Sequence, residues 1–275
     1  MKKIKYVFLI VWIILGAIAC QKTPLRTTEN IFPSDKSLIK FVLLSPNTPN
    51  VMLKANDSKL NNLSSAVGGF FPGIINNNAD YVAVPTSPKL TIVLPFAGTG
   101  SDSLVLFSGT FSTDANKNYS ATLADTGIDR TLFVIADNTG DTPKDSTYNI
   151  RFINAMAKSP NISLLRIDST NATQVVRDTL ASNITFKTAS DYISVPLTAK
   201  VNQASTTTPK LLYSFLRYRL IFTASGLPIT GAITPTQTIA APGLNQRYVT
   251  IYASGFATGL GALAPFLNTT IVYNK

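Results

Sequence analysis

Cys20 is the residue whose position in this chain indicates chemistry most clearly. It is the sole cysteine, and it follows Ala17-Ile18-Ala19 at the end of an apolar run that begins after a lysine-rich start. This arrangement is typical of a bacterial lipoprotein signal, although the usual leucine three positions before the cysteine is Ala17 here. In such signals the thiol becomes a thioether to diacylglycerol, and the amine is acylated after cleavage. The alternatives are an ordinary secretory signal with a chance cysteine and a retained membrane anchor.

Side chains that could carry catalysis are scarce. The chain has no histidine, which excludes Ser-His-Asp relays, Cys-His relays and histidine-ligated metal sites. A single cysteine excludes an intrachain disulfide and a four-cysteine zinc site. Ser37 and Lys40 have the spacing of a serine acyl enzyme, but they lead into a predicted strand, where positions three apart point to opposite faces. We therefore predict no catalytic residue and no cofactor.

Acidic residues offer two further hypotheses. Asp137, Asp141 and Asp145 recur in a polar segment and could supply oxygen ligands to Ca²⁺. They match no calcium-loop repeat, and aspartate is an ordinary turn residue, so no metal site is predicted. Glycoside hydrolysis needs only two carboxylates. Because the single glutamate, Glu29, lies in a predicted tether, such a pair would have to be two aspartates.

The segment Leu211–Thr223 alternates in polarity and is predicted to be one strand. One face carries Tyr213, Phe215, Arg217 and Arg219, since alternate residues share a face of a strand. Aromatic rings stack on sugars, and arginine pairs with acidic groups. This face is therefore a candidate ligand strip, and the alternative is a sheet face covered by a loop.

Composition and pattern favour an all-β protein. Charged residues make up only 14% of the chain, which is below the usual share. Threonine and asparagine are abundant instead; threonine favours strands and asparagine favours turns. Three of the 24 basic residues precede Cys20 and the chain has 14 acidic residues, which leaves a mature charge of +7. The basic residues are scattered, so we predict no nucleic-acid partner.

Two halves of the sequence resemble each other. Ile39-Lys40-Phe41-Val42 pairs with Ile150-Arg151-Phe152-Ile153, and Asp80–Pro85 pairs with Asp191–Pro196, at a constant offset of 111 positions. Further on, Asn118–Thr122 resembles Arg247–Ile251 at a larger offset. A repeat of domain size indicates tandem domains.

The repeats predict two tandem antiparallel β-sandwich domains of immunoglobulin- or transthyretin-like type, since each copy holds about seven short strands. The expected organisation is listed here in order: a signal peptide over 1–19, a lipidated tether over 20–37, the first sandwich over 38–138, a linker over 139–147, and the second sandwich over 148–275 with an insertion near 197–218.

These repeats carry a family resemblance. The opening Ile-basic-Phe strand, the turn Ser45-Pro46-Asn47-Thr48-Pro49-Asn50-Val51 and the Asp-Tyr-…-Val-Pro strand resemble the domain-of-unknown-function family 4397 over most of residues 38–275. Members are exported bacterial proteins, often lipoproteins of the Bacteroidota. The second copy of the turn, which ends in Ser159-Pro160-Asn161-Ile162, is degenerate. The resemblance implies a sandwich fold and an envelope location, and it implies no activity.

Four short segments resemble the Asp-Ser/Thr signal for O-glycosylation in Bacteroidota. The candidate acceptors are Ser103, Ser146, Ser169 and Thr179. The alternative is that Asp and Ser/Thr in these segments simply cap turns.

The sequence predicts a lipid-anchored cell-envelope protein with a non-enzymatic binding or scaffolding role towards glycans or envelope proteins. Its membrane contact is the lipid on Cys20, and because Gln21 is not aspartate, we expect the outer membrane. The alternative is an accessory domain of a hydrolase system or an Asp-based hydrolase.

Overall fold

The computed structural model describes residues 34–274 with internal gaps. The gaps are 47, 62–66, 73, 76–77, 96–101, 126–128, 171–172, 198, 203–209, 214–215, 230–235, 240–243 and 257–265. The predicted signal peptide and most of the predicted tether, with Cys20, therefore lie outside the described residues. Within the described part of the chain, no helix is long and apolar enough to cross a membrane.

The described chain is all-β, as the sequence predicted, and its strands form four main sheets and one separate hairpin. The first β region contributes two of these sheets. One is ordered β11(Thr131–Ala136), β10(Asn118–Ala124), β1(Lys36–Leu44) and β4(Val67–Phe71), with β7(Val82–Pro85) also paired to β1. The other is ordered β3(Ser58–Lys59), β2(Met52–Ala55), β8(Lys89–Pro95) and β9(Asp102–Thr110).

The second β region repeats this plan. One sheet is ordered β15(Ile193–Pro196), β12(Thr147–Ala157), β20(Tyr248–Phe256), β21(Phe266–Tyr273), β6(Asn78–Ala79) and β5(Ile74–Ile75). The other is ordered β14(Thr173–Ile184), β13(Ile162–Thr170), β18(Leu216–Phe222) and β19(Thr236–Ile239). The short strands β5 and β6 come from the first region, so a hairpin of one region extends a sheet of the other.

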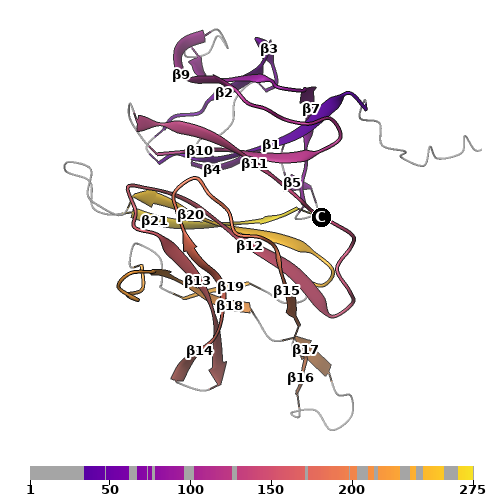
Figure 1. Ribbon diagram of the computed structural model, residues 1–275, viewed down its shortest axis with the longest axis vertical. Coiled ribbons are helices and arrows are strands. Elements are labelled where there is room, and N and C mark those ends of the chain that lie inside the picture. The colour runs from indigo at the N-terminus through magenta and orange to yellow at the C-terminus, as the bar shows by residue number, and fades with distance from the viewer. Residues whose placement is uncertain are drawn as a thin grey trace, which may run out of the picture. The chain divides into compact units, whose positions relative to one another are not determined.

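The four sheets stack as layers, as Figure 1 shows from top to bottom. Alternate residues of β1 explain the stacking, because they belong to different apolar clusters. Ile39, Phe41 and Leu43 pack in the core between the two sheets of the first region. Val42 and Leu44 pack with Ile153 in a cluster between the two regions. Both faces of β1 are therefore buried, which accounts for its long apolar run.

The sheets are not purely antiparallel, and in this respect the prediction was wrong. β1 pairs with β10 in parallel, and β12 pairs with β20 in the same way. Between β1 and β10 the chain crosses into the opposite sheet for β2, β8 and β9. A strand that returns after such a crossover can run in the direction of the first strand, whereas a tight hairpin cannot do so.

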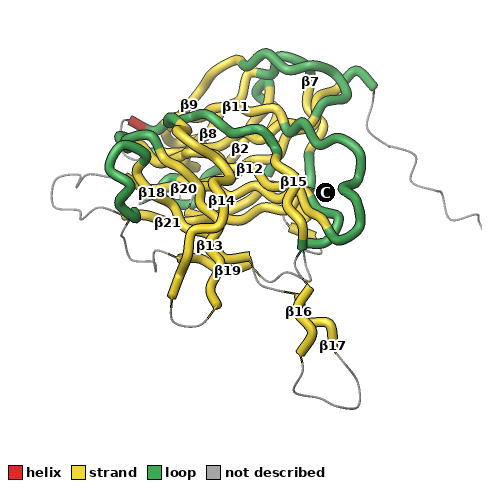
Figure 2. The backbone as a smooth tube through the Cα atoms, turned by 60° about the horizontal axis from the view of Figure 1, so that its bottom comes forward, coloured by secondary structure: helices red, strands yellow, loops and turns green. Residues whose placement is uncertain are grey.

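The predicted strand Leu211–Thr223 is divided in the structure. Its first part is β17(Lys210–Tyr213), which pairs with β16(Ala199–Asn202) in a separate hairpin. Its second part is β18, which pairs with β13 and β19. The β16–β17 hairpin falls within the predicted insertion at 197–218, and Figure 2 shows it apart from the main sheets.

The register of the parallel pairs corrects the later repeat alignment by one residue. Ile39 lies opposite Tyr119, and its counterpart Ile150 lies opposite Val249. Tyr119 therefore corresponds to Val249 rather than to Tyr248, and both pack in the core of their own region. A one-residue shift moves every side chain to the other face of a strand, which frees Tyr248 to pack on Tyr192 instead.

The cluster between the two regions leads to a first prediction. Ile153 is fully buried there, so Ile153→Ala should lower the free energy of unfolding by about 2–4 kcal/mol. Because the cluster joins both regions, wild type should unfold in urea as one transition, followed by fluorescence and circular dichroism. The matched control is Leu227→Ala at a site that is 64% exposed, with an effect within about 0.5 kcal/mol. Two separate transitions in the wild type would contradict the prediction.

Candidate functional site

Two basic side chains point from the repeats into the space between the two β regions. Lys40 sits in β1 between Ile39 and Phe41, which face the first core. Alternation along the strand therefore turns Lys40 towards the second region. Arg151, its counterpart in β12, is turned towards the first region in the same way. Lys40 is 1% exposed and Arg151 is 3% exposed, so both charges are buried.

Asp137 is the anion between these cations, and it follows directly after β11. Its Oδ2 accepts a hydrogen bond from Lys40 Nζ at 2.7 Å and one from the Tyr81 hydroxyl at 2.9 Å. Its Oδ1 pairs with Arg151. Ser120 Oγ donates to both oxygens, at 2.8 and 2.7 Å. One carboxylate thus binds a cation from each β region.

The second repeat supplies a matching set of polar groups. Tyr192 corresponds to Tyr81, and each ring lies beside the cation of its own region, with Arg151 Cζ 4.7 Å and Lys40 Nζ 4.8 Å from the respective ring centres. Thr250 accepts a hydrogen bond from Arg151 Nε at 3.0 Å. Such cation–aromatic contacts hold the charged groups in place.

Asn274 stands in the second repeat where Asp137 stands in the first. The backbone N–H of Asp137 donates to the carbonyl of Asn118, and that of Asn274 donates to the carbonyl of Tyr248. Asn274 Oδ1 accepts a hydrogen bond from Lys40 Nζ at 2.5 Å. Its Nδ2 donates to Thr250 Oγ1 at 2.7 Å and to the Tyr192 hydroxyl.

The electrostatics of the ion cluster (Lys40, Asp137 and Arg151) follow from burial and pairing. Burial alone would raise the pKa of Asp137, but Lys40 and Arg151 lower it to about 2, so its carboxylate is ionised. Burial lowers the pKa of Lys40 to about 8, against the opposing effect of Asp137. Burial, followed by the charge of Asp137, raises the pKa of the Tyr81 hydroxyl, which keeps that hydroxyl a hydrogen-bond donor.

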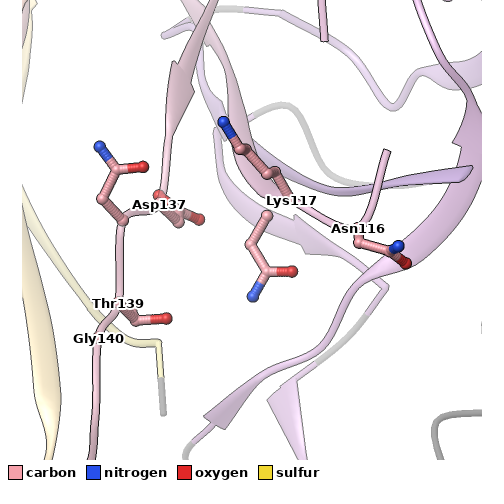
Figure 3. Close-up of a pocket in the computed structure, with 7 residues that line it drawn as sticks. Asn116, Lys117, Asp137, Thr139 and Gly140 are labelled. Atoms are coloured by element: carbon pink, nitrogen blue, oxygen red, sulfur yellow. The ribbon is translucent and has the colours of Figure 1, made fainter. Parts of the chain in front are cut away.

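A pocket of about 350 Å³ lies beside this cluster. Figure 3 shows Asn116 and Lys117 on one side and Asp137, Thr139 and Gly140 on the other. Amide and hydroxyl groups both donate and accept hydrogen bonds, so the rim suits a small polar ligand.

The structure does not bring the predicted ligand strip together on one strand. Tyr213 ends β17, whereas Arg217 and Arg219 lie in β18 and are half-buried. Phe215 lies outside the described residues. The strip as a binding surface stays a prediction.

The predicted modification sites are only partly visible. Ser146, in a turn, and Thr179, in β14, are exposed. Ser103 and Ser169 lie in β9 and β13, and their side chains are outside the described set. Cys20 is outside the described residues, as noted. O-glycosylation and lipidation both stay predictions.

Sequence reasoning missed the ion cluster, although one signal pointed to it. A basic residue in the middle of an apolar strand, repeated at a constant offset, indicates a buried charge that needs a partner. The polar residues that follow Asp137 indicate only a turn at this position. Its pairing with two cations leaves it no role as a calcium ligand, and no group of three acidic, histidine or cysteine residues suited to a metal occurs among the described residues.

Comparison with known proteins identifies one domain. Residues 37–165 match the model of a family described as Domain of unknown function (DUF4397), which confirms the resemblance over this segment. The match spans the first β region, β12 and the start of β13. No curated protein matches the chain.

Removing Asp137 should be far more harmful than removing an exposed aspartate. Asp137→Ala leaves two buried cations without their anion, so the free energy of unfolding should fall by about 3–5 kcal/mol. Asp129→Ala is the control, because Asp129 is exposed and pairs with the exposed Lys158, and it should change stability by less than about 1 kcal/mol. Urea denaturation measures both. Similar losses in the two variants would show that the ion cluster contributes little.

Proposed function

We propose, from the DUF4397 domain at residues 37–165, that the protein is a lipid-anchored protein of the bacterial outer membrane with a non-enzymatic binding or scaffolding role. In this proposal each β region is a sandwich domain of immunoglobulin- or transthyretin-like type. The observation that carries the scaffolding role is the Asp137 carboxylate held by Lys40 of one region and Arg151 of the other, and the proposed anchor is supported by Cys20 at the end of the lysine-led apolar segment.

The contacts of the cluster support a structural role for its charged groups. Every oxygen of Asp137 is engaged by protein donors, so the carboxylate serves to hold β1 and β12 against each other. Apolar side chains on the same faces, including Val42 and Ile153, extend the contact. A scaffold held in this way presents its outer loops in fixed positions, which favours recognition because less ordering is needed on binding.

Polar groups that could contact a ligand line the pocket beside the cluster, and others lie on β18. The polar pocket offers Asn116, Asn118 and Thr139, and β18 offers the half-buried Arg217 and Arg219. Amides and hydroxyls suit sugar hydroxyls, and arginine suits carboxylate or sulfate groups. Glycans of the envelope are therefore the ligand class that we propose, with envelope proteins as the other class.

Lipidation is tested in the native host. Wild type should be found in the outer-membrane fraction and should incorporate a labelled fatty acid, whereas Cys20→Ser should lose the label and stay unprocessed, because the acylated thiol is absent. Gln21→Asp is the matched control. It keeps the cysteine and the label, and by the enterobacterial sorting rule it should shift the protein to the inner membrane. A Cys20→Ser protein that is still processed and membrane-bound would overturn the proposed anchor.

Glycan binding is tested on an array of neutral and acidic oligosaccharides with the mature protein. Arg217→Ala/Arg219→Ala should weaken binding to acidic glycans by about tenfold or more, since each charge-assisted bond is worth about 1.5–3 kcal/mol. Lys89→Ala/Lys158→Ala removes the same charge from exposed sites and should bind as wild type does. Equal losses in both double variants, or no binding to any glycan, would contradict the proposed ligand class.

A further inference from the structure

An amine, a carboxamide and a carboxylate meet in the buried space between the two β regions. Lys40 Nζ lies 2.5 Å from Asn274 Oδ1 and 2.7 Å from Asp137 Oδ2. All three residues are more than nine-tenths buried. The arrangement places the carbonyl group of Asn274 and the carboxylate of Asp137 within hydrogen-bond reach of the Lys40 amine, so the nucleophile has both its target and a base beside it, as attack assisted by a base requires.

The charges of this site are unbalanced. Among the residues that the structure describes around the cluster, Lys40 and Arg151 are cations and Asp137 is the single anion paired with them. The second repeat carries the neutral Asn274 where the first carries Asp137. An unbalanced charge in a desolvated site is costly, so a reaction that removes one positive charge from the interior is favoured.

We propose that Lys40 Nζ and Asn274 Cγ become joined by an intramolecular isopeptide bond. Asp137 takes a proton from the Lys40 ammonium group, and the freed amine attacks Cγ of Asn274. The C–Nδ2 bond then breaks, and the leaving nitrogen takes up the two protons that the lysine gives up. The products are a secondary amide between the two side chains and one ammonium ion, so atoms and charge balance.

The neighbouring groups suit each step. Burial lowers the pKa of Lys40 to about 8, so a neutral amine is accessible near physiological pH. To attack, Lys40 Nζ has to move only from its contact with Asn274 Oδ1 to Cγ, the carbon bonded to that oxygen. The leaving Nδ2 is held by the hydroxyls of Thr250 and Tyr192, while Asp137 Oδ2 lies 2.7 Å from the lysine nitrogen that gives up its protons.

The bond would join the two β regions covalently. Lys40 lies in β1 of the first region, and Asn274 directly follows β21 of the second. With Cys20 as the sole cysteine, an intrachain disulfide is excluded, so an isopeptide bond would supply the covalent link that exported proteins often obtain from cystines. After the reaction Asp137 and Arg151 remain as a balanced ion pair.

Peptide mass spectrometry of the protein purified from its host tests the bond directly. Trypsin does not cleave after an acylated lysine, so residues 37–54 should be recovered as one peptide joined to residues 248–275. The branched product should be lighter than the sum of its two parts by one ammonia, about 17 Da. Separate recovery of residues 37–40 and 41–54, with no branched product, would overturn the proposal.

Three variants and one control locate the chemistry. Lys40→Arg should abolish the branched product, and Lys117→Arg, an exposed control, should keep it. Asn274→Asp should keep the branch, but should lose water, about 18 Da, relative to its own uncross-linked peptides. Asp137→Asn should abolish or strongly slow the reaction, because the base is lost. A branched product that persists in Lys40→Arg would contradict the assignment of the lysine, and the wild-type peptide map decides the proposal even if a variant fails to fold.

Discussion

The carboxylate of Asp137 is desolvated, and this constraint organises the surrounding structure. A buried carboxylate is unfavourable unless its oxygens are paired with cations and donors. Lys40 reaches it from β1 and Arg151 reaches it from β12, and neither region alone supplies both cations. The cluster therefore fixes the relative register of the two inner sheets, in addition to the non-directional packing of the apolar side chains around it.

The internal repeat explains how such a site can form. Two copies of one plan place a basic residue, a tyrosine and a hydroxyl at equivalent points, and the contacts cross from one copy to the other. The two copies then differ in the basic residue and in the polar residue that follows the last strand. The planar guanidinium of Arg151 reaches the Ala136 carbonyl, Thr250 and Asp137 at once, whereas the compact ammonium of Lys40 is a point charge. Asn274 accepts a hydrogen bond from the Lys40 ammonium group, whereas an aspartate at this position would balance its positive charge.

More of the fold than of the candidate site could be predicted from the sequence. Strand positions were predictable because alternation and turn residues are local signals. The 111-residue offset also identifies β12 as the counterpart of β1, and β15 as the counterpart of β7. The parallel pairing of β1 with β10 and the union of β6 with β21 were not predictable, because they depend on contacts between distant segments. Asp137 was missed for the same reason: the residues that follow it are polar, and its burial depends on Lys40 and Arg151.

The inner sheets and the outer elements of the fold are constrained by packing to different degrees. The inner sheets carry β1 and β12, which are buried on both faces, so their side chains are constrained by packing on each side. The outer sheets and the β16–β17 hairpin have one side free of that constraint. The two repeats differ most there: the hairpin of β13 and β14 is long, whereas its counterpart, β2 and β3, is short. Changes in these outer elements leave Asp137 and its two cations untouched, so different ligands could be accommodated on an unchanged buried frame.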